Sequence, residues 1–277
     1  MIMKKNLFFF LGIFLFCVLL SGCDSDVEVE SFPETAKTEV TLFAGSGIDD
    51  DSLLTRSVLD TLGKQHWSLA DVINVNGQVS TKTALPGNNT YAAFTVKAAS
   101  PYYAFYPGNA TNLVYNSSTH VFTYDFPATQ AYNENSSYIL SDGVNPMVAT
   151  GINPYLSFYN VCGVLKAQIF ANISDVSKVR FLSADNAVAG NVTVNPVMKT
   201  LTVTGTTKSM DVTFAAVRSL SSATPITVCW VLPTGKYGVG WQIQLLGATG
   251  NILSKKVFST TVLNVNRSRF SRASIWF

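Results

Sequence analysis

Apolar and polar side chains alternate with period two along several short segments, and this pattern restricts the fold more than any other feature. In residues 239–245 (VGWQIQL) four apolar residues share one face, and Gln242 and Gln244 lie between them. Residues 164–170 (VLKAQIF) alternate in the same way, with Lys166 and Gln168 on the polar face. Because successive side chains of a β-strand point to opposite faces of a sheet, both segments predict strands with one buried face.

Other segments rich in β-branched and aromatic residues are separated by turn formers. We expect further strands over residues 38–43, 71–75, 91–96, 120–124, 178–182, 200–204, 210–214, 226–231 and 256–263. Only residues 53–62 have helical spacing, and a strand is an equally good interpretation there. With 47% hydrophobic and 13% charged residues, the chain has the composition of sandwich proteins. We therefore predict an all-β fold of two β-sandwich domains with Greek-key or transthyretin-like topology.

The predicted domain boundary lies where turn residues cluster, between Ser141 and Pro154. We expect an N-terminal sandwich over residues 36–150 and a C-terminal sandwich over residues 151–277. Two segments precede them, a lipoprotein signal peptide over residues 1–22 and an acidic tether over residues 23–35.

The signal peptide is predicted from a basic start and a short apolar run. Lys4 and Lys5 precede fourteen almost wholly apolar residues, 7–20. A helix of that length spans roughly 21 Å, less than the roughly 30 Å of a bilayer core, which favours a cleaved secretory signal. The residues that follow, Leu20-Ser21-Gly22-Cys23, resemble a bacterial lipobox.

A lipobox would have the thiol of Cys23 acylated and the chain cut between Gly22 and Cys23. Two or more acyl chains hold a protein stably on a bilayer, since each buried CH₂ contributes about 0.8 kcal/mol. The alternative is a plain signal with a coincidental cysteine. We expect the lipid of the outer membrane to be a partner of this chain, and an unmodified Cys23 would contradict that expectation.

Removing the signal peptide makes the chain formally neutral. The whole chain has 19 basic and 17 acidic residues, so loss of Lys4 and Lys5 leaves 17 of each. This balance offers no electrostatic support for binding nucleic acid. The acidic stretch from Asp24 to Glu30 is expected to be a solvated tether.

Two cysteines remain besides Cys23 in the expected mature chain. Cys162 and Cys229 could form a disulfide in an oxidising compartment. The alternative is a pair of buried free thiols, because both lie inside predicted core strands and nothing in their spacing brings them together.

Residues with catalytic or metal-binding chemistry are sparse. His66 and His120 are the only histidines, which makes a histidine metal site or acid–base relay improbable. Asp49-Asp50-Asp51 lacks the spaced oxygen ligands of a calcium loop. We expect no metal and no cofactor. The aromatic stretch from Tyr102 to Tyr106 could bind a ligand, although a strand with one buried face is the simpler interpretation.

Several pieces of the sequence, taken in order, resemble the fimbrillin family, the Mfa-like and FimA-like subunits of type V pili. They are Thr55-Arg56-Ser57, residues 67–75 (WSLADVINV), 104–107 (AFYP), 127–130 (PATQ), 158–166 (FYNVCGVLK), 179–181 (VRF) and 189–194 (AGNVTV). Together they cover most of residues 38–200, while the remaining C-terminal third matches only in its β character.

This resemblance implies two β-sandwiches, no enzyme activity and a lipoprotein route to the cell surface. In family pilins an arginine-directed protease removes the N-terminal strand, and a strand of the next subunit fills the vacated groove. The corresponding cut here would lie between Arg56 and Ser57, although members that are never cleaved also carry such a pair. The donated strand would be residues 270–277 (FSRASIWF), whose end is unusually apolar for a free tail.

The leading hypothesis is therefore a surface-exposed, lipid-anchored fimbrillin-type subunit whose partners are other pilus subunits. A rival is a glycan-binding surface lipoprotein of a polysaccharide-uptake system, with a platform built from Tyr102, Tyr103 and Tyr106 or from Trp230 and Trp241. A hydrolase with paired carboxylates ranks last, because no two acidic residues form an evident motif.

Overall fold

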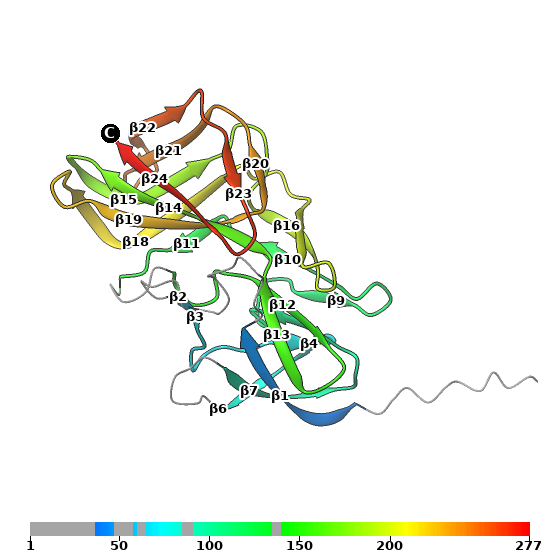
Figure 1. Cartoon of the computed structure of the whole chain (residues 1–277). Helices are drawn as coiled ribbons and strands as arrows, with labels where there is room; N and C mark the ends of the chain where they lie inside the picture. Colours follow the sequence, from blue (N-terminus) through cyan, green and yellow to red (C-terminus); the bar gives the residue numbers. More distant parts are fainter. Residues whose placement is uncertain (1–36, 47–57, 60–64, 85–90, 135–139) are drawn as a thin grey trace, which may run out of the picture. The chain divides into compact units, whose positions relative to one another are not determined.

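The computed structural model describes residues 37–46, 58–59, 65–84, 91–134 and 140–277. All the regular elements in these ranges are β-strands, which confirms the predicted all-β fold (Figure 1). No helix in the described ranges has the length and apolar character needed to cross a membrane. Gly22, Cys23, Asp49 to Asp51, Arg56 and Ser57 lie outside the described residues, as does most of the segment with helical spacing.

The largest sheet has eight strands, in the order β5-β4-β8-β12-β13-β1-β7-β6. Its strands are β1 (Thr38–Ser46), β4 (Asn74–Val75), β5 (Gln78–Val79), β6 (Thr81–Ala84), β7 (Ala92–Ala98), β8 (Tyr102–Tyr106), β12 (Met147–Gly151) and β13 (Tyr155–Asn160). The short strands β2 (Val58–Leu59) and β3 (Gln65–His66) pair separately. β1 lies inside the sheet, parallel to β13 and antiparallel to β7.

One face of this sheet encloses a hydrophobic cluster that we call the Trp67 core. Trp67 is 1% exposed and meets Phe94, Tyr106 and Phe158 edge to face, with ring centroids 5.3, 5.5 and 5.5 Å away. Leu42 of β1 is fully buried in the same cluster. Edge-to-face packing is a preferred arrangement of aromatic rings, so this tryptophan is a central contact of the sheet.

The remaining strands form four smaller sheets. They are β9 (Val114–Asn116), β10 (Val121–Phe126), β16 (Gly190–Asn195) and β17 (Thr200–Val203) in one; β11 (Thr129–Ala131), β18 (Ser209–Leu220), β15 (Ile173–Leu182), β21 (Trp241–Leu246) and β22 (Ile252–Phe258) in a second; β19 (Ile226–Pro233), β14 (Cys162–Phe170) and β24 (Phe270–Trp276) in a third; and β20 (Gly235–Tyr237) with β23 (Leu263–Val265) in the fourth. Their buried side chains form a second cluster, the Trp230 core, in which Leu165, Val179 and Trp230 are fully buried.

β8 contributes to both cores, which corrects the expectation of one buried face. Tyr102 and Tyr106 belong to the Trp67 core, whereas Phe105 belongs to the Trp230 core. Phe105 stacks on Phe122 of β10 with ring centroids 5.4 Å apart. The second face of β8 is buried because the sheet that contains β10 packs against it.

The predicted division at residue 150 falls inside β12, so strand pairing crosses it. β12 pairs with β13 in the eight-stranded sheet, and β10 pairs with β16. Residues 36–277 group as one compact unit. The existence of two domains with these limits therefore stays a prediction, although the chain does have two separate hydrophobic cores.

Gly163 of β14 is a glycine whose lack of a side chain is required. A Cβ atom there would lie 2.3 Å from the main-chain oxygen of Asn266, in the segment that leads into β24. Gly45 of β1 differs, because nothing lies within 4 Å of its virtual Cβ. Close approach of the main chain thus explains the glycine at 163 but not the one at 45.

Candidate functional surfaces

β1 is the first candidate element, because the cut predicted after Arg56 would detach it. Residues 38–44 of β1 pair with β7, and residues 43–46 pair with β13. Leu42 and Ala44 are fully buried in the Trp67 core. Both neighbouring strands follow Arg56 in the sequence. A chain cut at Arg56 would therefore keep both edges that flank β1 and lose the strand between them.

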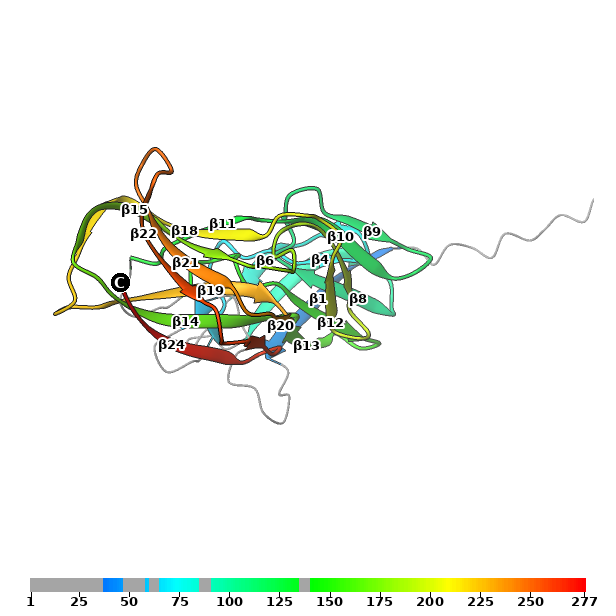
Figure 2. The same ribbon diagram turned by 90° about the horizontal axis from the view of Figure 1, so that it is seen from above.

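The C-terminal strand β24 is the second candidate, as the predicted donated strand. It pairs with β14 of its own chain in parallel, with Val164 opposite Phe270 and Phe170 opposite Trp276 (Figures 1 and 2). Ile275 is 1% exposed, and Trp276 stacks on Phe170 with centroids 4.0 Å apart. The apolar end is thus a paired edge strand in this structure. Donation to another subunit stays a prediction.

Cys162 and Cys229 are free, buried thiols. They lie on the neighbouring strands β14 and β19, where Cys162 is opposite Pro233 and Cys229 is opposite Lys166. Four residues along a strand correspond to roughly 13 Å, beyond the roughly 7 Å between Cα atoms that a disulfide spans. The structure therefore contradicts the candidate disulfide and agrees with the alternative, in which the two thiols are separate and buried. Burial raises the pKa of Cys229 to about 12, against a smaller lowering by Lys166.

The aromatic residues predicted to form a glycan platform are almost all buried. Tyr106 is 1% exposed, and its hydroxyl donates a hydrogen bond to Oδ1 of Asp71 at 2.7 Å. Trp230 and Trp241 are 0% and 2% exposed, with indole N–H groups bonded to main-chain oxygens. Tyr102 is also buried. Neither predicted platform is available to a ligand as a whole, since both tryptophans and two of the three tyrosines are core residues.

Tyr103 is the half-exposed ring of that string, and it contacts a histidine. Tyr103 stacks on His120 with centroids 4.1 Å apart, and the Nδ1 atom of His120 lies 2.8 Å from the hydroxyl of Tyr115. His66 lies on β3, far from this site in the sequence. No group of three or more potential metal ligands exists among the described residues.

Gln130 and Asp211 are buried polar residues with structural partners. The Gln130 amide donates to the oxygen of Val231 and accepts from its N–H, both at 3.0 Å. Asp211 accepts two hydrogen bonds from Arg180, at 2.6 and 3.0 Å, and lies 3.2 Å from Nζ of Lys178. The hydrogen bond to Asp211 raises the pKa of Arg180. These groups are satisfied within the protein, as buried polar groups normally are.

Exposed aromatic rings occur on the outer face of the eight-stranded sheet. Phe43, Tyr91 and Tyr155 are 38%, 48% and 70% exposed and line a depression of about 470 Å³. Phe43 stacks on Tyr155 with centroids 5.3 Å apart. The sequence pattern gives no sign of this surface, because Phe43 and Tyr155 become neighbours only through the parallel pairing of β1 with β13.

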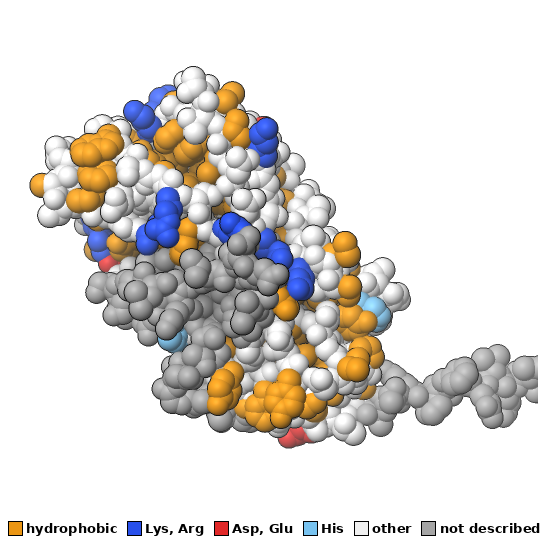
Figure 3. Space-filling model, viewed as in Figure 1, with side chains coloured by type: hydrophobic (Ala, Val, Ile, Leu, Met, Phe, Trp, Pro, Cys, Tyr) orange, Lys and Arg blue, Asp and Glu red, His pale blue; other side chains and the backbone are white. Residues whose placement is uncertain are grey.

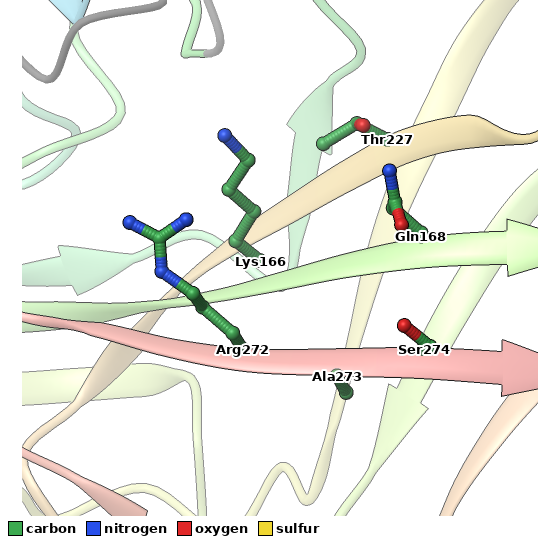
Figure 4. A pocket seen from close by; sticks show the side chains of 6 residues that line it. All are labelled: Lys166, Gln168, Thr227, Arg272, Ala273 and Ser274. Carbon is green, nitrogen blue, oxygen red and sulfur yellow. The ribbon is translucent and has the colours of Figure 1, made fainter.

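A polar depression of about 400 Å³ lies on the outer face of the sheet formed by β19, β14 and β24. Six residues line it: Lys166, Gln168, Thr227, Arg272, Ala273 and Ser274 (Figure 4). Lys166 and Arg272 extend to the same side from neighbouring strands, and they are opposite each other in register. The alternation of each strand could have marked these residues as outward-facing. Their meeting depends on a pairing between segments about a hundred residues apart in the sequence.

The sequence matches no family model and no curated protein. Its fold is similar to that of solved bacterial proteins. A candidate cell adhesion protein from Bacteroides ovatus superposes with a TM-score of 0.53 over 87% of this chain and 93% of that chain, at 12% identity. Two other solved structures are less similar. A candidate cell adhesion protein from Bacteroides uniformis has a TM-score of 0.44 at 13% identity, over 86% of this chain and 93% of that chain. A fimbrial protein from Bacteroides vulgatus has a TM-score of 0.40 at 8% identity, over 86% of this chain and 95% of that chain. The first likeness shows a shared fold across nearly the whole of both chains.

Proposed function

We propose that this chain is a surface-exposed, lipid-anchored subunit of fimbrillin type that acts in cell adhesion as a stalk, tip or anchor component of a type V pilus. The observation that carries the proposal is the position of β1 inside the eight-stranded sheet, ahead of Arg56 in the sequence and between two strands that follow it. The fold shared with a candidate cell adhesion protein supports the adhesive role.

Loss of β1 would create a site for another strand. The main-chain groups of β7 and β13 that now bond to β1 would lose their partners, and the pocket of the Trp67 core that holds Leu42 would open. Unpaired main-chain groups and exposed apolar surface both favour addition of a strand. An incoming strand that repeats the pairing of β1 would run parallel to β13 and antiparallel to β7.

The anchor and the donated strand complete the proposed function. Acyl chains on Cys23 would hold the unprocessed subunit on the outer membrane, with its partner lipid. β24 would be the strand given to the next subunit, which requires its release from β14 and exposure of Ile275, now 1% exposed. The proposed activity is adhesion and assembly, with no enzyme reaction and no cofactor.

The N-terminal residue of protein sheared from cells tests this proposal. Wild-type shaft protein is expected to begin at Ser57, because an arginine-directed protease would cut after Arg56. The variant Arg56→Lys keeps the positive charge and should instead begin at an acylated Cys23, while the control Lys64→Ala should still begin at Ser57. An Arg56→Lys protein that is processed like wild type would refute cleavage at this site.

Mass spectrometry of the N-terminal peptide tests the anchor separately. A lipid-modified Cys23 is expected in unprocessed protein, and Cys23→Ser should release the chain from the membrane fraction. Detection of an unmodified Cys23 at the surface would refute the anchor and leave the role of β1 to be decided by the first experiment.

A second candidate function is glycan capture by a surface lipoprotein of a polysaccharide-uptake system. The exposed rings of Phe43, Tyr91 and Tyr155 favour it, since ring faces can stack on sugars and the two tyrosine hydroxyls add a polar tip at a wet surface. Affinity gels with neutral polysaccharides test it. Retardation that is lost in Tyr155→Ala would support this function, and unretarded migration in every gel would exclude it.

A further inference from the structure

The outward face of the β14–β24 pair carries side chains in an ordered row. Pairing in register places Lys166 opposite Arg272, then Gln168 opposite Ser274, then Phe170 opposite Trp276. Side chains two residues apart on a strand share a face and are separated by roughly 6.6 Å. The row therefore presents a cation pair, a neutral hydrogen-bonding pair and an aromatic pair, one after another. Thr227 of β19 borders the neutral pair.

The cation pair has no acidic partner among the described residues. Lys166 and Arg272 each lie over the ring of Phe270, at 5.6 and 5.4 Å from its centroid. Like charges directly opposite on neighbouring strands destabilise a sheet. Lys178 and Arg180 on β15 are arranged differently, since both contact the carboxylate of Asp211.

The charge of the chain is divided unevenly, which concentrates positive potential around this row. Residues 151–277 contain 12 Lys and Arg but only 3 Asp and Glu. Figure 3 shows Lys and Arg side chains on the face that includes this sheet, where Asp and Glu are sparse. A surface with an excess of one charge attracts ligands of the opposite charge and speeds their association. The neutrality of the mature chain as a whole conceals this excess.

We propose that this row binds a carboxylate-bearing sugar chain, a glycan that contains uronic acid or a similar acidic residue. The Arg272 guanidinium can form two hydrogen bonds with one carboxylate, and Lys166 adds a second positive charge beside it. Gln168, Thr227 and Ser274 offer an amide and two hydroxyls to sugar hydroxyls. Trp276, 58% exposed and supported by Phe170, offers a ring face for the next sugar.

The spacing of charge favours such a glycan over a nucleic acid or a polyphosphate. One cation pair is followed by neutral residues along the strands, so the row matches a single negative charge flanked by hydroxyls. A phosphate backbone carries a charge at every nucleotide and is usually bound by a continuous series of cations. Figure 4 shows Lys166 and Arg272 together and Gln168 and Ser274 farther along the same strands, an order that suits a ligand chain that passes along them. This inference does not depend on pilus assembly.

Calorimetric titration of the full-length protein with aldotetraouronic acid, a xylotriose that carries one methylglucuronate, tests the proposal. The double variant Lys166→Gln/Arg272→Gln should bind about tenfold more weakly or worse, because charge-assisted hydrogen bonds are lost. The control Lys255→Gln/Lys256→Gln removes the same charge from exposed positions on β22 and should bind like wild type. Trp276→Ala should weaken binding by a smaller factor. Unchanged melting temperatures of the variants would exclude unfolding as the cause.

Other ligands decide whether the site is specific. The methyl ester of aldotetraouronic acid, which lacks the charge, should bind much more weakly than the acid. Inorganic phosphate, a poly-glutamate peptide and an oligothymidylate should compete poorly. The proposal is overturned if aldotetraouronic acid fails to bind, if the β22 control loses as much affinity as the double variant, or if any of these other anions competes equally well. None of these outcomes depends on whether Arg56 is cleaved, so failure here is distinguishable from failure of the proposed function.

Discussion

Replacement of Trp67 by alanine should lower the free energy of unfolding by about 3–5 kcal/mol, the range for large buried aromatic residues. Trp67 is 1% exposed and makes three edge-to-face ring contacts, with Phe94, Tyr106 and Phe158. Each such pair contributes about 0.5–1.5 kcal/mol beyond the area that it buries. The alanine variant loses all three and leaves a cavity, which places the expected loss in the upper part of the range.

Trp67→Phe should cost much less, about 1–2 kcal/mol. The buried indole N–H of Trp67 has no acceptor among the described residues, and a buried unpaired donor costs about 1–3 kcal/mol. Phenylalanine removes that donor while it keeps a ring beside the three neighbours. The loss of packing volume is thus partly offset.

Urea unfolding followed by far-ultraviolet circular dichroism measures both variants, with Trp276→Ala as the control. Trp276 is 58% exposed and has one ring contact, so its replacement should cost about 1 kcal/mol or less. A Trp67→Ala variant as stable as Trp276→Ala would refute the central role of Trp67. A Trp67→Phe variant as unstable as Trp67→Ala would refute the argument from the unpaired N–H.

Three further predictions concern buried positions elsewhere. Gly163→Ala should destabilise the protein by about 1–3 kcal/mol or more, because a Cβ there would lie 2.3 Å from a main-chain oxygen. Gly45→Ala should be nearly neutral, because nothing lies within 4 Å of its virtual Cβ, and thermal melts compare the two variants. Gln130→Ala should cost about 2–4 kcal/mol in urea unfolding, because it leaves a buried N–H and a buried carbonyl of β19 unpaired, and an equal cost for the exposed Gln78→Ala would contradict this. Burial raises the pKa of the Cys229 thiol to about 12. The stability that the neutral thiol contributes is therefore complete below the unfolded-state pKa of about 8.5, and it is lost as the pH rises toward 12. Native protein at pH 8 should therefore resist alkylation of this thiol, as mass spectrometry of iodoacetamide-treated protein would show, and rapid labelling would refute its burial.

Local alternation predicted most of the strands because it records which face of each strand is buried. Leu165, Ala167 and Ile169 are buried as expected, and Lys166 and Gln168 are on the outer side. The prediction is less accurate where a segment meets neighbours on both faces or lies beyond the strand. Gln244 is 5% exposed although it was expected outside, and Val239 is 52% exposed because β21 begins only at Trp241.

Pairing between distant segments is the part that the sequence pattern could not predict. Period two defines faces but carries no information about which strand lies alongside which, or in what register. The predicted strand at 256–263 is split between the end of β22 and the start of β23, which belong to different sheets. The aromatic surface at Phe43 and Tyr155 and the cation pair at Lys166 and Arg272 both arise from parallel pairings. Tyr106 and Trp230, which were predicted to belong to ligand platforms, are core residues because distant segments pack against them.

The two proposals for this chain meet at β24 and exclude each other there. The acidic-glycan row needs Arg272, Ser274 and Trp276 to remain beside β14, whereas strand donation removes all three from it. A ligand that binds only the paired state stabilises that state in proportion to RT ln(1 + [L]/Kd). An acidic glycan should therefore hold β24 in its own chain and oppose assembly, and a subunit that has donated β24 should no longer bind the glycan. If β24 is never donated, the same row is a permanent binding surface, which would suit a subunit at the tip better than one in the shaft.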